Sequence, residues 1–316
     1  MFGSNLTGII ADDLTGANDT ALQFHMRGCN TQIVLNSDNS LDGTKLKNAQ
    51  VCAISTETRN LDKQNAYNKT KAACQKLYDN FNVEYLYKKI DSTLRGNIAV
   101  EIKAILDVLN NDAAIVVPAF PKENRITIGG YHLLKGVPIE RTELARDPKF
   151  PIYESHIPTI LNTDLKEFGC DLKVGTIDFK IVVKGAALIL MEIHKLINEG
   201  VKIIVIDAQS SIDLEQIALA VKKSTFNLLP VGAAGFAAAL SDIWLPDFKN
   251  NRINIKLQKQ PKFIVSGSAT ELTASQITKL KDEYEECLYS YSLKIDDIIK
   301  ATGLSKEEIE KLTEDK

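Results

Sequence analysis

Residues 6–25 read LTGIIADDLTGANDTALQFH, and this stretch decides the fold. Its first part, Leu6–Ala11, is a short apolar run, typical of a buried β-strand. The polar loop Asp12–Asp19 follows and leads into a helical pattern. A strand, a polar turn and a helix in this order indicate one unit of a parallel α/β sheet.

The same unit recurs along the chain. Seven further apolar runs rich in β-branched residues predict strands: Thr31–Leu35, Val51–Ser55, Tyr85–Ile90, Ala113–Pro118, Lys202–Ile206, Leu228–Val231 and Lys262–Val265. Amphipathic stretches between them predict helices: Asp62–Tyr78, Asn97–Leu109, Ala187–Asn198 and Leu214–Lys223. We therefore expect an α/β fold, with a mostly parallel sheet flanked by helices.

Two segments interrupt this rhythm. Residues 119–160 hold five of the nine prolines, and within them Tyr131–Arg141 predicts a hairpin, either a lid over a site or a decoration of the sheet edge. The segment Leu245–Gln260 is typical of a linker. We expect a first domain of residues 1–248, a linker of residues 249–261 and the start of a second, incomplete α/β domain in residues 262–316.

Composition excludes several classes of protein. The 316 residues include 38 basic and 41 acidic side chains, a net charge of −3, which gives no reason to expect nucleic acid or an anionic membrane as partner. The five cysteines lack CxxC spacing and favour a reducing compartment over a disulfide framework or a zinc site. Without a signal-peptide pattern or an 18-residue apolar run, the expected location is the cytoplasm.

Polar side chains gather where the predicted strands end, which is where open α/β sheets bind ligands. These clusters are DDLTGAND (residues 12–19), STETR (55–59), KKIDSTLRGN (88–97), PAFP (118–121) with Arg125, Asp207-Ala208, GAAG (232–235) and SGSAT (266–270). Arginine can grip a carboxylate through two hydrogen bonds, and aspartate accepts from hydroxyl groups. The combination suits a small polyhydroxylated acid, and an aspartate beside a hydroxyl could also orient it for attack on a phosphoryl group.

Each cluster also has a purely structural explanation. Asp13, Thr15, Ser92 or Thr93 could cap helices, and Lys88 and Lys89 could lie at a solvated strand edge. Asp91 and Arg95 could form a structural ion pair, and Gly232 and Gly235 could serve close packing. Familiar motifs are missing: the sequence has no Walker A, GxGxxG, HExxH or GxSxG pattern. The four histidines, His25, His132, His156 and His194, show no metal-ligand spacing.

Taken together, the loops resemble those of the four-carbon acid-sugar kinase family. The motifs that carry the resemblance are IIADDLTGANDT, KKIDSTLRGN, PAFP with a following arginine, GGYHLLKGVPIERTELARDP, VIDAQSSIDL, GAAGFAAAL and IVSGSATELTASQI. They run from about residue 8 to about residue 280. The resemblance implies phosphorylation of threonate, erythronate or 3-oxo-tetronate with ATP and Mg²⁺. It also implies an acid-sugar-binding domain followed by a nucleotide-binding domain.

The resemblance also implies roles for individual residues. Asp12, Asp91 and Arg95 are the expected catalytic residues. The expected substrate-binding residues are Asp13, Ser92, Arg95 and Arg125, and those expected at the nucleotide are Gly232, Gly235, Ser266, Gly267 and Ser268. The hypothesis is that Arg95, with Arg125, holds the acid's carboxylate while Asp12 or Asp91 orients its terminal hydroxyl. No residue is assigned to a protein-bound metal.

The sequence departs from the family pattern in three places. Asn124-Arg125 stands where Gly-Arg is usual, and the Gly232–Gly235 turn lacks a serine. The glycine-rich late nucleotide motifs have no counterpart, and the chain is roughly 100 residues shorter than a complete two-domain member. Two alternatives to the kinase stay open: a non-catalytic sugar-acid-binding module or fragment, and an aldolase or isomerase acting on hydroxy acids. The oligomeric state is open too, with the Tyr131–Arg141 hairpin as a candidate contact of a homodimer.

Overall fold

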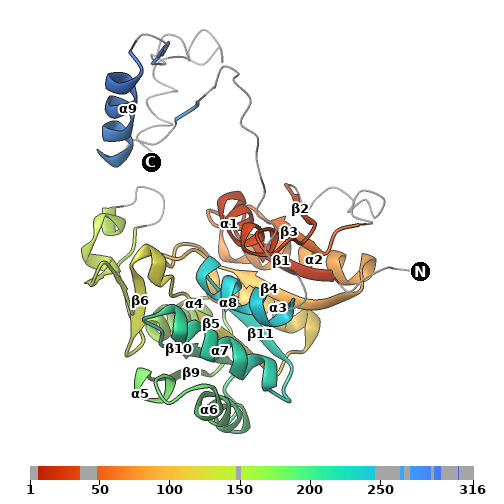
Figure 1. The fold of residues 1–316 in the computed structure, drawn as a ribbon. Coiled ribbons are helices and arrows are strands. Elements are labelled where there is room, and N and C mark those ends of the chain that lie inside the picture. The colour runs from red at the N-terminus through yellow and green to blue at the C-terminus, as the bar shows by residue number, and fades with distance from the viewer. Residues whose placement is uncertain are drawn as a thin grey trace. The chain divides into compact units, whose positions relative to one another are not determined.

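The computed structural model describes residues 6–35, 48–146, 151–245, 264–266, 271–285, 288–292 and 305. The chain divides into two compact units, Met1–Ile253 and Asn254–Lys316. The first unit carries the sheet (Figure 1). In the described part of the second unit there is one helix, α9 (Glu271–Glu283).

The main sheet has eight strands, and every neighbouring pair is parallel. Their order is β2-β3-β1-β4-β11-β5-β10-β9. The strands are β1 (Leu6–Ala11), β2 (Thr31–Val34), β3 (Val51–Ser55), β4 (Val83–Lys89), β5 (Ala113–Val117), β9 (Val174–Ile177), β10 (Ile203–Ile206) and β11 (Leu228–Gly232). The predicted α/β fold with a mostly parallel sheet is confirmed.

Helices cover both faces of the sheet, because successive side chains of a strand point to opposite faces. Ile9 and Ala11 pack with the helices of one face, whereas Ile10 packs with those of the other. The first face carries α1 (Leu14–His25), α5 (Phe179–Val182), α6 (Ala186–Asn198), α7 (Ser211–Lys223) and α8 (Ala234–Trp244). The second carries α2 (Lys63–Asn80), α3 (Ile98–Leu109) and α4 (Ile157–Glu167).

The predicted hairpin forms and belongs to a small antiparallel sheet. Its strands are β6 (Arg125–Ile128), β7 (Tyr131–Leu134) and β8 (Val137–Pro138), flanked by the short helices η1 (Pro121–Glu123), η2 (Ile139–Arg141) and η3 (Glu143–Arg146). Lys135 and Gly136 turn the chain with φ angles of 52° and 78°. Asp207, directly after β10, accepts from the N–H groups of Gly129 (2.7 Å) and Gly130 (2.9 Å). Asp207 therefore anchors the small sheet to the main one.

Two expected elements fall largely outside the described residues. Of the expected strand Lys262–Val265, only Ile264 and Val265 are described; neither is in a strand, and both are exposed. The charged, amphipathic pattern from Ser305 onward also predicts a helix, and this segment lies outside the described residues apart from Ser305 itself.

Candidate active site

The strand order of the main sheet changes direction at β1. Strands β2 and β3 lie on one side of β1, and β4 and the later strands lie on the other. At such a point the loops at the carboxyl ends of the strands diverge and leave a crevice for a ligand. The loops that follow β1, β3 and β4 carry Asp12, Arg59 and Asp91 respectively.

Arg59 joins these three loops. Its Nε lies 2.7 Å from Asp12 Oδ2, its Nη1 lies 2.7 Å from Asp13 Oδ2, and its Nη2 lies 3.9 Å from Asp91 Oδ1. The Arg59 side chain is only 14% exposed. Burial would lower its pKa, but the charges of the three aspartates outweigh burial and raise it. Three of the predicted site aspartates are thus held around one guanidinium, to which sequence reasoning had assigned no role.

Asp91 is held on its other side by Arg95. Arg95 Nε donates to Asp91 Oδ2 at 2.7 Å, its Nη2 lies 3.5 Å from Oδ1, and the Thr93 hydroxyl also donates to Oδ2. Burial would raise the pKa of Asp91, but Arg95, Arg59 and Thr93 hold it well below its usual range. The ion pair that was open as a structural alternative is present. An aspartate so strongly held in its ionised form is a weak base.

Asp12 differs from Asp91 in having one oxygen to spare. The residue is 2% exposed, and its Oδ2 accepts from Arg59. Its Oδ1 is buried and has no hydrogen-bond partner among the described residues. A buried oxygen without a partner is costly, unless a ligand supplies the donor. Asp12 therefore offers an acceptor for a ligand hydroxyl, whereas the Asp13 carboxylate caps α1 by accepting from Gly16 N at 2.8 Å.

The two lysines at the end of β4 are both buried, 0% exposed at Lys88 and 4% at Lys89, so the alternative of a solvated strand edge is wrong. They point to opposite faces of the strand. Lys88 Nζ pairs with Glu101 Oε2 at 2.7 Å, and the Thr58 hydroxyl donates to the same carboxylate. This buried network supports the loop that holds Arg59, because Thr58 N donates to the Asp12 carbonyl at 2.9 Å.

The small sheet supports the loop after β4 through His132. His132 is fully buried, and its Nε2 lies 2.8 Å from the Ser92 carbonyl oxygen. A carbonyl only accepts, so Nε2 carries the proton and Nδ1 accepts from the Thr127 hydroxyl at 3.1 Å. Burial lowers the pKa of His132 to about 4, despite the hydrogen bond to Ser92. The neutral ring positions Ser92 by its backbone.

This buried histidine predicts a loss of stability in mild acid. The unfolded chain binds a proton at a pKa of about 6.5, whereas folded His132 does so only at about 4. The contribution is fully present above pH 6.5 and is lost as pH falls toward 4, by about 3 kcal/mol in all. Urea unfolding of His132→Gln between pH 7 and 4 should show a shallower pH dependence than the wild type. His156→Gln is the control, and equal slopes for wild type and His132→Gln would contradict the assignment.

The other predicted substrate residue, Arg125, lies beside this cluster at the start of β6. Its Nε is buried and has no hydrogen-bond partner among the described residues. Its charge acts on His132 and on Asp19 of α1. Asp19 also feels the charge of Lys89, so Arg125 and Lys89 both face this aspartate.

The residues expected at the nucleotide are less completely described. A Cβ on Gly232 would lie 2.3 Å from the Val117 carbonyl oxygen, and one on Gly235 would lie 2.9 Å from the Phe120 ring. Close packing therefore explains both glycines, and their contact with ATP stays a prediction. Ser266 is exposed in the second unit, while Gly267 and Ser268 lie outside the described residues.

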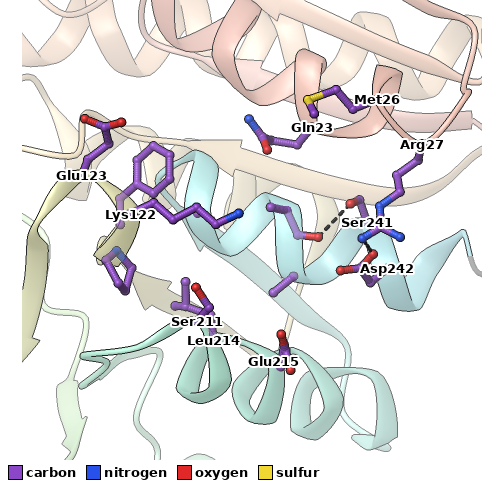
Figure 2. A pocket seen from close by; sticks show the side chains of 15 residues that line it. Gln23, Met26, Arg27, Lys122, Glu123, Ser211, Leu214, Glu215, Ser241 and Asp242 are labelled. Carbon is purple, nitrogen blue, oxygen red and sulfur yellow. Dashed lines mark hydrogen bonds and ion pairs between the residues drawn. The ribbon is translucent and has the colours of Figure 1, made fainter. Parts of the chain in front are cut away.

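A separate cleft of about 430 Å³ lies over α8, between α1, α7 and η1 (Figure 2). Small residues of α8, Gly235, Ala238 and Ala239, contribute to its lining. Lys122 extends into it, and an ion pair between Arg27 and Asp242 lies on its wall (Figure 2). Of the predicted site residues that the structure describes, only Gly235 lines this cleft, so the aspartate–arginine cluster is a distinct feature.

Comparison with known proteins places the chain in a family. The profile of the sugar-binding N-terminal domain matches residues 7–240. The chain is 35% identical to the D-erythronate kinase of Heliobacterium modesticaldum over 88% of its length, and 33% identical to the D-threonate kinase of Salmonella typhimurium over 85%. The chain therefore belongs to the family defined by this sugar-binding domain. The match covers 61% of the length of the first relative and 59% of the length of the second.

A solved structure supports the same placement. A domain of unknown function from Bordetella bronchiseptica, a domain-swapped dimer with bound citrate, matches with a TM-score of 0.66 and 32% sequence identity. The match covers 77% of this chain and 58% of that one.

In the described part of our chain, no helix is long and apolar enough to cross a membrane.

Proposed function

We propose that the protein is an ATP-dependent kinase that phosphorylates the terminal hydroxyl of a four-carbon acid sugar, such as threonate, erythronate or 3-oxo-tetronate. The observation that carries the proposal is the buried Oδ1 of Asp12, which has no hydrogen-bond partner among the described residues and is set beside Arg59, Asp91 and Arg95 at the switch point of the sheet. The names of the relatives support the reaction class. The citrate in the Bordetella structure, a hydroxylated acid, is consistent with the substrate class.

In this proposal Asp12 is the catalytic base. Its Oδ1 accepts the proton of the substrate hydroxyl while the hydroxyl oxygen attacks the γ-phosphorus of ATP. The new bond joins the sugar oxygen to phosphorus, the bond from phosphorus to the β-phosphate oxygen breaks, and ADP leaves. Arg59 holds Asp12 Oδ2 at 2.7 Å and so fixes the direction in which Oδ1 points. Asp91 is the poorer candidate for the base, because Arg95 and Thr93 already engage it.

The acid's carboxylate would be bound by arginine. Arg95 is 29% exposed at its side chain, twice the figure for Arg59, so it is the more accessible of the two guanidinium groups. Arg125 has a buried Nε without a partner in the described residues and would add a second donor. Asp13 and Ser92 complete the expected substrate shell.

Mg²⁺ in kinases is held through one or two carboxylates and the phosphates of the nucleotide, where it neutralises charge that develops in transfer. The described residues contain no group of three histidine, cysteine, aspartate or glutamate side chains arranged to hold a metal ion. In this proposal, no step uses a metal site formed by protein ligands alone. Contacts of ATP with Ser266, Gly267 and Ser268 remain a proposal.

Calorimetric titration without nucleotide tests the substrate half of the proposal. D-Threonate or D-erythronate should bind at one site per chain, whereas the uncharged tetritol of the same length should bind at least tenfold more weakly. Equal binding of acid and tetritol would remove the carboxylate from recognition. Binding of the acid with no turnover in the presence of ATP would favour the non-catalytic binding module instead.

We also propose that the protein forms a homodimer, as the Bordetella relative does. The small sheet presents apolar side chains to solvent, with Ile128 41%, Tyr131 50% and Val137 42% exposed. Light scattering should give the mass of two chains. A monomer over the whole range of concentration would contradict the proposal.

A further inference from the structure

Lys89 is a buried cation without a hydrogen-bond or ion-pair partner in the part of the chain that the structure describes. It is 4% exposed, yet its ammonium makes no hydrogen bond or ion pair within 4.0 Å among the described residues. The preceding lysine on the same strand shows the contrast, because Lys88 pairs with Glu101 and donates to the Lys89 carbonyl at 2.8 Å. A buried charge is normally paired. Among the described residues, Lys89 therefore lacks the ion pair and hydrogen bond that a buried structural lysine such as Lys88 makes.

The position of the ammonium is set by the first turn of α1. A Cβ added to Gly16 would lie 2.8 Å from Lys89 Nζ and 2.6 Å from Asp13 Oδ1. Lys89 Nζ therefore lies over the N-terminus of a 12-residue helix, where the N–H groups carry partial positive charge. Glycine at position 16 lets the ammonium approach the helix this closely, because the Cβ of any other residue would clash with it. The first turn of α1 contains no acidic residue.

Four aspartates and one arginine act on the charge of the Lys89 ammonium. Burial lowers its pKa, the charges of Asp12, Asp91 and Asp13 raise it, and Arg59 lowers it. Asp19 of α1 faces it as well. The aspartates of the cluster are already taken up by Arg59 and Arg95 at 2.7 Å, so they do not saturate the ammonium.

We propose that Lys89 and the N-terminus of α1 form an oxyanion subsite within the active site. The group bound there is the carboxylate of the acid or the phosphoryl group in transfer, and both present oxygens that an ammonium and a helix N-terminus recognise. The inference rests on the proposed function for the identity of the ligand. It adds Lys89, a residue of the KKIDSTLRGN loop without an individually assigned role, to the expected binding residues.

Two variants of Lys89 test the proposal. Lys89→Met removes the charge and keeps the length of the side chain, and Lys89→Arg keeps the charge. Loss of one charged hydrogen bond should weaken oxyanion binding by about 10–100-fold in Lys89→Met, with partial recovery in Lys89→Arg. The melting temperature of Lys89→Met should stay the same or rise, because an unpaired buried charge is removed. Lys103→Met, on the surface of α3, is the matched control.

The ligands distinguish the two sources of the oxyanion. If the carboxylate binds there, Lys89→Met weakens D-threonate in calorimetry and leaves the tetritol unchanged. If the phosphoryl group binds there, D-threonate affinity is kept, while the affinity for inorganic phosphate and kcat both fall. Unchanged affinity for both ligands with unchanged kcat would overturn the proposal. A wild type that binds these anions through Lys89 but shows no turnover would instead overturn the kinase assignment alone.

Discussion

Replacing Asp12 by asparagine is expected to lower kcat by about 10²–10⁴-fold, the usual contribution of a general base. Asparagine keeps the shape of the side chain, and its amide oxygen can still accept from Arg59. The remaining NH₂ group would occupy the place of Oδ1, which in the wild type is buried and accepts no hydrogen bond from the described residues. That group cannot take a proton from the substrate hydroxyl. The acid should still bind, so KM should change far less than kcat.

The matched control for this variant is Asp107→Asn. Asp107 is an aspartate of α3 that pairs with Lys103 and accepts from the Tyr67 hydroxyl at 2.7 Å, outside the cluster. Its substitution should leave both kinetic constants within about twofold of the wild type, as expected for exposed ion pairs of small net effect. If Asp12→Asn retained wild-type kcat, Asp12 would not be the base. If Asp91→Asn then lowered kcat by the factor expected for a general base, the role of base would pass to Asp91.

Removing the guanidinium of Arg59 is expected to have the largest effect on stability. In Arg59→Met, Asp12 and Asp13 lose contacts of 2.7 Å, and Asp91 loses a charge 3.9 Å away. Because Asp12 and Asp91 are buried, their charges are then less well compensated. Breaking a buried ion pair by removing one partner costs about 3–5 kcal/mol of the free energy of unfolding, which urea unfolding at pH 7 measures.

The same variant should also lose acid binding, since uncompensated carboxylates repel an anionic ligand. Arg59→Lys restores a charge but not the three-way geometry of the guanidinium, so intermediate values are expected. Arg141→Met is the control, because Arg141 is 76% exposed and lies 3.7 Å from its partner, Glu140. A loss of less than 1 kcal/mol in Arg59→Met would show that the cluster is not held by this residue.

The sequence predicted strands best where they are fully buried. The bounds of β1 and β3 agree with the apolar runs Leu6–Ala11 and Val51–Ser55, because all their residues are buried. Strand β9 was missed, since the edge sequence VGTI has a glycine and a threonine and is half exposed. Strand β6 was missed for a similar reason: Arg125–Ile128 is short and half buried.

The sequence predicted most residues of the candidate site, but not the ion pairs and hydrogen bonds that join them. Parallel topology brings the strand ends to one edge, so Asp12, Asp91 and Arg95 could be expected there. The role of Arg59 depends on contacts with two other loops, which spacing along the chain does not reveal. The signal was present, because Arg59 follows the strand that pairs with β1. Burial of Lys88 and Lys89 was equally hidden, since two adjacent lysines are usually solvated.

Acid-dependent release of ADP tests the central claim most directly. The protein is incubated with ATP and Mg²⁺, together with D-threonate, D-erythronate or 3-oxo-tetronate, and ADP is followed by a coupled assay. We expect at least one of these acids to stimulate ADP release over the rate without acid. We also expect Asp12→Asn to abolish that stimulation while it still binds the acid in calorimetry. Absence of stimulation by every acid, or equal stimulation in Asp12→Asn, would contradict the account.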